Sequence, residues 1–381
     1  MYGYSHSKTN QYYMKNRVKN IVFDSIALMA ILVLATSCQH KDLCYYHPHV
    51  APVKVKVDWE KANGNASAID GMTAHLFAMQ ELDQKISTTV TTHQTNEIVF
   101  DLLEGNYSVA VFNNTPDEYS TLKFYDLGDY NNASVQVSET NVSWYSKYNV
   151  KSNDKFEAHQ PEWIARGVAK DIIVNKEMVE RAEKEYIDAG FKMSARNVNE
   201  VGKDVVPDSL VCTFTIRVEL QGIDSYFRAR AMVSGLAIGK YIISGEPLDE
   251  SVSHYAGMDS WKLVKNSMTP DGKGEIQGTI TCFGLPAGLY ARLSEGFNLE
   301  PGDLKLTMEI LLNDSERTPF RCEKAIEIGH LVKQNGVNLY MEKAVPFPDP
   351  LPYVKPADGE EGGFGVGIED WEKEEIEILN H

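Results

Sequence analysis

The first third of the chain alternates apolar and polar side chains over short segments. Residues 53–59 read Val-Lys-Val-Lys-Val-Asp-Trp, the period of two that is typical of a strand with one buried face. Similar patterns, separated by Gly, Asn, Asp and Pro residues that favour turns, predict strands at 73–79, 97–103, 107–113, 121–125 and 133–137. Short strands at this spacing predict a β-sandwich rather than a parallel sheet.

The period changes to that of a helix at residues 176–189. Asn175 is a favourable N-cap residue, and Gly190 is suited to the left-handed position that often follows a helix. One face of this segment is apolar, and it is formed by Met178, Val179, Ala182, Tyr186 and Ala189. The pattern predicts one amphipathic helix that packs on a sheet or links two domains.

Strand patterns return from about residue 205. They predict strands at 210–220, 226–236, 261–264, 275–283, 304–312, 320–328 and 336–342. Residues 102–107 and 285–290 share the pattern L-x-x-G-x-Y, in which the glycine is expected to form a tight turn before a strand whose tyrosine packs inward. A chance match and a duplicated sandwich both explain so short a similarity.

The patterns together predict a mainly β protein with two β-sandwich domains and one amphipathic helix between or beside them. The C-terminal residues are rich in proline, glycine and acids, which predicts an extended tail, although 374–379 alternates well enough to add an edge strand. The predicted organisation is a signal peptide at 1–37, a tether at 38–50, an N-terminal sandwich at 51–174, a helical connection at 175–204, a C-terminal sandwich at 205–346 and a tail at 347–381.

Composition narrows the class of partner. The 381 residues include 37 basic and 54 acidic side chains, so the net charge is −17. This length suits about two or three domains. A nucleic-acid-binding protein needs a basic face, and so does a protein that docks electrostatically on anionic lipid, so the charge balance argues against both.

The N-terminal segment resembles the signal peptide of a bacterial lipoprotein. Basic residues at 8–19 precede an apolar run at 26–35, which spans about 15 Å as a helix and is too short to cross a bilayer. Small residues then lead into Cys38, as in a lipobox, where the cysteine thiol receives diacylglycerol. An ordinary signal peptide with a chance cysteine is the alternative. Residues 39–42 partly resemble the surface-export signal of Bacteroidetes lipoproteins, which predicts an outer-membrane lipoprotein at the cell surface, with the periplasmic face as the alternative.

No motif predicts catalysis, a cofactor or a resident metal. Residues 235–240 resemble a phosphate-binding loop only briefly, because one residue is missing between the glycines and Tyr241 stands where Ser or Thr is needed. The segment that holds His40, Cys44, His47 and His49 is interpreted as local packing rather than as a metal site. The chain is therefore predicted not to be an enzyme, although paired carboxylates of a hydrolase cannot be recognised in a linear sequence.

Two modifications remain open at this stage. Asp208-Ser209-Leu210 resembles the sequon of Bacteroides O-glycosylation, so Ser209 is a candidate acceptor. In an oxidising compartment one or two disulfides can form, and buried free thiols are the equal alternative. The sequence does not choose among the pairings of Cys44, Cys212, Cys282 and Cys322.

The lipobox, residues 43–49 and the strand at 53–59 resemble a family of Bacteroides lipoproteins of undefined function. This family is grouped with the fimbrillin-associated anchor and minor-subunit lipoproteins of the Bacteroidales, and residues 368–371 resemble closing strands of fimbrillin-like proteins. The resemblance implies two transthyretin-like sandwiches, a lipid anchor at Cys38 and contacts between strand edges and pilin-like subunits. The implied role is fimbria (pilus) anchoring or assembly, or that of a minor adhesive subunit. The alternative is a surface glycan-binding lipoprotein of a polysaccharide-uptake system, for which 19 tyrosines and five tryptophans could supply stacking surfaces.

Overall fold

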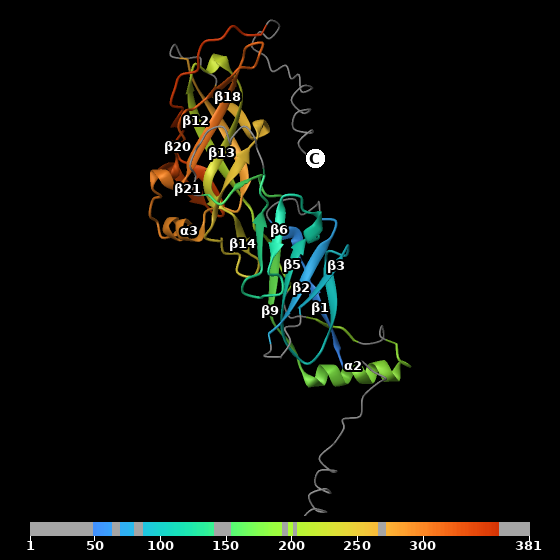
Figure 1. Cartoon of the computed structure of the whole chain (residues 1–381). Helices are drawn as coiled ribbons and strands as arrows, with labels where there is room; N and C mark the ends of the chain where they lie inside the picture. Colours follow the sequence, from blue (N-terminus) through green and yellow to red (C-terminus); the bar gives the residue numbers. More distant parts are fainter. Residues whose placement is uncertain are drawn as a thin grey trace, which may run out of the picture.

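The computed structural model describes residues 49–62, 69–79, 87–140, 154–192, 197–200, 204–265 and 272–357. Strands dominate these residues, and the prediction of a mainly β protein is confirmed. Figure 1 shows two lobes, one above the other, with the N-terminal strands in one and most of the C-terminal strands in the other. Each lobe contains two sheets that face one another across an apolar core.

The N-terminal sandwich is built from a three-stranded and a five-stranded sheet. Its strands are β1 (Ala51–Lys56), β2 (Met72–Ala78), β3 (Ser87–Thr92), β4 (Glu97–Leu102), β5 (Gly105–Asn113), β9 (Ala165–Val174), β10 (Asn199–Glu200) and β11 (Asp208–Ser209). The sheet orders are β10-β1-β4 and β11-β9-β5-β2-β3. Alternate residues of β1 and β4, such as Val53, Val55 and Phe100, point into the core, as the period of two predicts.

The C-terminal sandwich contains two six-stranded sheets. Its strands are β8 (Glu157–Ala158), β12 (Cys212–Gln221), β13 (Tyr226–Ala237), β15 (Ser251–Ala256), β16 (Trp261–Lys265), β17 (Lys273–Cys282), β18 (Lys305–Leu312), β19 (Pro319–Arg321), β20 (Ile326–Glu327), β21 (Val332–Asn335), β22 (Asn338–Met341) and β23 (Val345–Pro346). One sheet has the order β16-β17-β12-β22-β21, with β23 also on β12, and the other has the order β19-β18-β13-β15-β8, with β20 also on β18.

A third, smaller sheet joins the two halves of the chain. It consists of β6 (Leu122–Tyr125), β7 (Ser134–Val137) and β14 (Gly239–Tyr241), in the order β14-β7-β6. The approach of β14 to β7 depends on Gly239, because a Cβ atom there would stand 2.0 Å from the backbone oxygen of Val135. A further apolar cluster, which includes Phe112, Ile238 and Phe283, lies beneath this sheet and draws residues from both halves. The domain boundaries given above stay a prediction.

Two α-helices accompany the sheets. Helix α2 (Lys176–Asp188) is capped by the Asn175 side chain, and it buries Val179 and Ala182 against the N-terminal sandwich. Figure 1 places α2 at the end of that sandwich farthest from the other lobe, so of the two predicted positions the helix lies beside a sandwich rather than between the two. Helix α3 (Ala287–Ser294) was not predicted from the sequence.

The shared L-x-x-G-x-Y pattern forms two different structures. In the first copy, Gly105 begins β5 and Tyr107 is buried, with its hydroxyl donating to the Leu103 carbonyl oxygen at 3.1 Å. In the second copy, Gly288 lies inside α3 and Tyr290 is 43% exposed. The expected turn before a strand with an inward tyrosine is therefore wrong for residues 285–290, where Pro286 caps a helix.

Single-turn 3-10 helices complete the described secondary structure. They cover Trp59–Lys61, Pro116–Glu118, Ile223–Ser225, Met258–Ser260, Pro301–Asp303 and Gly329–Leu331. None of the helices within the described residues combines the length and hydropathy that a membrane crossing requires.

Candidate functional site between the sandwiches

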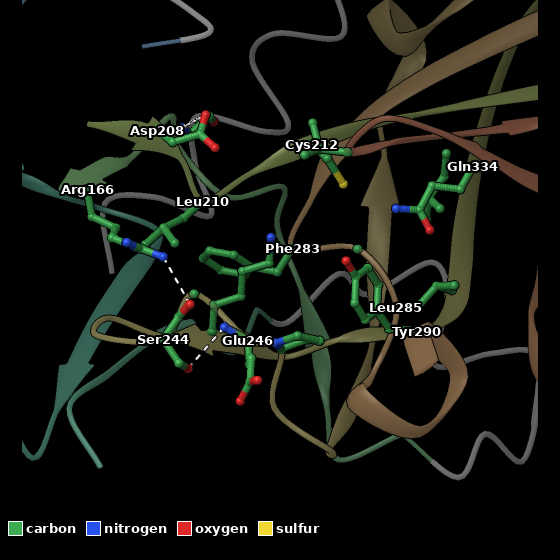
Figure 2. Close-up of a pocket in the computed structure, with 17 residues that line it drawn as sticks. Arg166, Asp208, Leu210, Cys212, Ser244, Glu246, Phe283, Leu285, Tyr290 and Gln334 are labelled. Carbon is green, nitrogen blue, oxygen red and sulfur yellow. Dashed lines mark hydrogen bonds between the residues drawn. The ribbon is translucent and has the colours of Figure 1, made fainter. Parts of the chain in front are cut away.

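A pocket of about 340 Å³ opens where the two sandwiches meet, and we call it the junction pocket. Its walls come from β9, β11, β12, β14, the turn after β14, α3 and the hairpin of β21 and β22. Figure 2 shows Arg166 on one side and Gln334 on the other, with the Cys212 sulfur directed between them. Segments that are far apart in the sequence therefore share one hollow of a size that suits a small ligand.

Arg166 forms the N-terminal wall of the junction pocket. Its Nη2 donates to the Ser244 carbonyl oxygen at 3.1 Å, whereas its Nε is buried without a hydrogen-bond partner. The guanidinium packs on Gly245, where a Cβ atom would stand 2.1 Å from Nη2 and where φ is +75°. Burial lowers the pKa of Arg166, and the Asp208 carboxylate partly opposes this. A guanidinium remains charged under these conditions and needs an acceptor for its unpaired N–H.

Lys240 supplies a second cation from β14. Burial lowers the pKa of its ammonium group, and the nearby thiols of Cys212 and Cys282 act in the opposite direction. No side-chain hydrogen bond or ion pair joins Lys240 to any residue that the structure describes. Lys240 is half-buried, and the Asp208 carboxylate also opposes the effect of burial on its pKa.

Cys212 lines the junction pocket and forms a pair with Cys282. The two residues face one another across β12 and β17, with their sulfur atoms 3.7 Å apart as free thiols. The hydrogen bond between the two thiols, in which either sulfur can be the donor, lowers the pKa of Cys212 and raises that of Cys282. Cys322 lies apart from them, against the backbone of Met308. The fourth cysteine of the sequence analysis, Cys44, lies outside the described residues.

Ser209 also lines the junction pocket, but its hydroxyl is already used. The half-buried Ser209 is part of β11, and its Oγ donates to the Val211 carbonyl oxygen at 2.8 Å. O-glycosylation of Ser209 therefore stays a prediction. Cys38, the predicted lipidation site, lies outside the described residues.

The histidine cluster predicted to be a packing segment is only partly described. His40 and His47 lie outside the described residues, whereas the exposed His49 lies 3.6 Å from the Glu183 carboxylate on α2. Within the described residues, no group of three or more His, Cys, Asp or Glu side chains is placed to hold a metal ion.

Sequence reasoning missed the junction pocket. Arg166 belongs to a strand that was not predicted, and Lys240 attracted notice only as the last residue of a failed phosphate-binding loop. Residues 165–169 gave no clear sequence signal, because the half-buried positions hold both Arg166 and the apolar Val168.

His254 is the most buried histidine near this region, and it gives the fold a predicted pH dependence. The side chain on β15 is fully buried, and its Nδ1 lies 3.1 Å from the His159 carbonyl oxygen. Burial lowers the pKa of His254 from 6.5 to about 4, against weaker opposing effects of two backbone carbonyls and Asp154. In the unfolded chain the His254 imidazole therefore binds a proton below about pH 6.5. In the folded chain it binds that proton only below about pH 4.

We expect the free energy of unfolding to decrease as the pH is lowered from 6.5 to about 4. Between pH 6.5 and pH 4 the protonation of His254 in the unfolded chain lowers the free energy of unfolding by about 3 kcal/mol. The measurement is urea unfolding at several pH values for the wild type and for His254→Gln, with the exposed His93→Gln as the matched control. The variant H254Q should lose most of this slope and H93Q should keep it. Equal slopes in the wild type and H254Q would contradict the assignment.

Three solved structures that are similar to this chain come from Bacteroides and Porphyromonas species. A candidate adhesin from Bacteroides ovatus is 14% identical over 83% of this chain and 99% of its own, with a TM-score of 0.49. The fimbrial anchor protein Mfa2 from Porphyromonas gingivalis is 13% identical over 72% of this chain and 82% of its own, with a TM-score of 0.30. The tip fimbrial protein Mfa3 from Porphyromonas gingivalis, with a C-terminal truncation, is 9% identical over 71% of this chain and 80% of its own, with a TM-score of 0.28.

The resemblance to a family of undefined function is confirmed by a family model. No curated protein matches the sequence. A family model does match, over residues 37–256, which is more than half of the chain. The chain therefore belongs to the family DUF5119, a domain of unknown function.

Proposed function

We propose that this protein is a cell-surface lipoprotein that takes part in fimbria-related adhesion. Its finer role is to anchor or assemble the fimbria, or to serve as a minor adhesive subunit, through contacts between strand edges. Mfa2 is described as a fimbrial anchor protein and Mfa3 as a tip fimbrial protein. We propose a role of that kind for this chain. The observation that carries the proposal is the open edge of β3.

Strand β3 lies at the end of its sheet. It pairs with β2 along its whole length, from Met72 opposite Thr92 to Phe77 opposite Ser87, and no other strand of the described chain pairs with it. Its sequence, Ser-Thr-Thr-Val-Thr-Thr, contains no charge and no proline. An uncharged strand edge of this kind is a template to which an extended segment of another subunit can add.

Other sheet edges carry the features that discourage strand addition. Strand β4 carries Glu97 and Asp101, and β16 carries Lys262 and Lys265. Charges at edge strands oppose the pairing of a further strand. Among the longer edge strands in the described part of the chain, β3 is therefore the one best suited to accept a partner.

Replacing Thr91 by lysine should weaken the capture of a fimbrial partner. Thr91 is exposed on β3, so its substitution adds a charge to the edge. It removes the 3.3 Å contact between the hydroxyls of Thr91 and the buried Thr73, and Thr73 keeps its hydrogen bond to the Asn114 carbonyl oxygen. The experiment is a pull-down of the full chain from detergent-solubilised outer membranes, scored by quantitative mass spectrometry. The wild type should recover fimbrillin-like subunits in stoichiometric amounts, and T91K should recover them with affinity reduced about tenfold, or about 1.4 kcal/mol.

The matched control is Thr213→Lys. Thr213 is also exposed on a strand, but β12 is paired on both sides, by β17 and β22, so it offers no free edge. T213K should capture partners as the wild type does. Recovery of a glycan-import complex in place of fimbrial subunits, or of no partner at all, would refute the fimbrial role. Equal recovery by T91K and the wild type would refute the role of β3.

A further inference from the structure

Cys212 and Cys282 are held in the backbone geometry that a disulfide bond requires. The two residues stand directly opposite one another in the antiparallel pair of β12 and β17. Directly opposed residues of such a pair have Cα atoms about 4.5–5.5 Å apart, and a disulfide spans a Cα separation of about 4.4–6.8 Å. The two sulfur atoms are already 3.7 Å apart, so rotation of the side chains about χ1 can bring them to bonding distance.

Cys322 has a different environment. It is buried, and its sulfur accepts from the Met308 N–H and donates to the Met308 carbonyl oxygen, both at 3.4 Å. Of the three cysteines in the described part of the chain, Cys212 and Cys282 are therefore the two whose sulfur atoms contact one another. The strand register selects this pairing, which the spacing of cysteines in the sequence could not do.

We propose that Cys212 and Cys282 are joined by a disulfide bond in the exported protein, whereas Cys322 stays a thiol. The proposal rests on the proposed function in one respect, because a cell-surface protein matures in an oxidising compartment. The oxidant is the disulfide of a second protein or of a small molecule. The Cys212 thiolate attacks it and forms a mixed disulfide, and the Cys282 sulfur then attacks the Cys212 sulfur. Two protons and two electrons leave the chain, and the oxidant departs as two thiols.

Cys212 is better suited than Cys282 to make the first attack. Cys212 lines the junction pocket, and Figure 2 shows its sulfur among the other pocket residues, whereas Cys282 is fully buried. The hydrogen bond between the thiols, together with the charge of the Lys240 ammonium, lowers the pKa of Cys212. The same hydrogen bond and burial raise the pKa of Cys282. Since the thiolate is the reactive form, Cys212 begins the exchange and Cys282 completes it.

The bond lies where the C-terminal sandwich receives the chain from the N-terminal half. Strand β11 of the N-terminal sandwich ends at Ser209, and Cys212 is the first residue of β12. Cys282 is the last residue of β17, so the bond closes a loop that contains β12 to β17. A pull along the chain, of the kind that a fimbrial anchor or adhesive subunit bears, reaches this sandwich first at Cys212. The bond carries the tension directly to Cys282 and prevents extension of the strands between them.

The test is differential thiol labelling of the full chain. Cells are lysed in detergent with N-ethylmaleimide, and the purified chain is denatured, labelled before and after reduction, and mapped by peptide mass spectrometry. Cys212 and Cys282 should take label only after reduction, and Cys322 should take it before. Cys212→Ala should make Cys282 available to label without reduction. The matched control is Cys322→Ala, which also shortens a buried cysteine and should leave the pair protected.

Thermal unfolding supplies a second measurement. Reduction should lower the melting temperature of the wild type and of C322A by about 5–15 °C, because the bond closes a loop with 70 positions between its ends. Reduction should leave the melting temperature of C212A unchanged. Labelling of Cys212 and Cys282 before reduction, or a bond from either of them to another cysteine, would overturn the proposal. Failure of the proposed function appears separately, as the absence of fimbrial subunits from the pull-down.

Discussion

Replacing Glu309 by alanine is expected to lower the free energy of unfolding by about 3–5 kcal/mol. Glu309 lies on β18 and is fully buried, so its negative charge has no contact with water. Its carboxylate is satisfied by two arginines instead. Arg230 Nη2 lies 2.6 Å from Oε1, and Arg321 Nε donates to Oε2.

The strand register explains why this small network is so closely integrated. Glu309 stands directly opposite Arg230 of β13 on one side and directly opposite Arg321 of β19 on the other. Arg230 has 16% of its side chain exposed and Arg321 has 37%. Removal of the glutamate leaves two cations close together at a half-buried position without the carboxylate that lies between them, which is strongly unfavourable.

The measurement is urea unfolding of the wild type and of Glu309→Ala, followed by circular dichroism. The matched control is Glu219→Ala, because Glu219 also lies on a strand of the C-terminal sandwich and pairs with Lys273, but its side chain is 47% exposed. We expect E219A to change the free energy of unfolding by less than about 1 kcal/mol.

A second variant separates the cost of uncompensated charge from the cost of shortening a buried side chain. Replacing Glu309, Arg230 and Arg321 together by leucine and methionines removes every charge of the network. This triple variant should recover much of the stability that E309A loses, because an apolar replacement of a buried ion network is often neutral or stabilising. Equal losses in E309A and E219A, or no recovery in the triple variant, would contradict the argument.

The strands that could be predicted from the sequence are those whose alternation is regular. Strand β1 alternates from Val53 to Lys56, and β4 and β12 follow the same rule. Strand β9 was missed because its alternation is broken. Lys170 and Asp171 are both exposed and together face one residue of β5, and Asp171 has φ +58°, which is the geometry of a β-bulge.

Strand β3 was missed for a different reason. Four of its six residues are threonine, and Val90, which packs against the core of the N-terminal sandwich, is its single apolar residue, so no apolar periodicity marks it. Threonine favours strands through its branched Cβ atom, but a single-sequence reading based on apolar spacing gives that preference little weight. An open, polar edge is therefore the kind of strand that hydrophobic patterning detects worst.

The junction pocket could not be predicted because it is a product of long-range pairing. Arg166 and Lys240 come together only because β9 pairs with β11 and β14 pairs with β7 across the two halves of the chain. Short motifs report local chemistry, whereas this site depends on contacts between residues more than 70 positions apart. The proposed lipid anchor is the opposite case, since all of its signals lie within consecutive residues.

Replacing Cys38 by alanine is expected to abolish lipid attachment and release the protein from the membrane. The thiol of Cys38 is the proposed acceptor of diacylglycerol, and alanine offers no nucleophile at that position. Each buried methylene of an acyl chain contributes about 0.8 kcal/mol to membrane binding, so loss of two or more chains removes nearly all of the affinity. The measurement is metabolic labelling with radioactive palmitate, combined with detergent phase separation of the cell extract.

Cys44 provides the matched control, because it lies six residues downstream and outside the lipobox. Cys44→Ala should keep the palmitate label and remain in the detergent phase, whereas C38A should lose the label and move to the aqueous phase. The same pair of variants decides between the two interpretations of the N-terminus. A lipoprotein signal depends on the cysteine itself, but an ordinary signal peptide depends on small residues before the cleavage site. Absence of label from the wild type and from both variants would therefore establish an ordinary secreted chain and remove the lipid anchor from the proposed function, whereas retention of label by C38A would refute Cys38 as the acceptor.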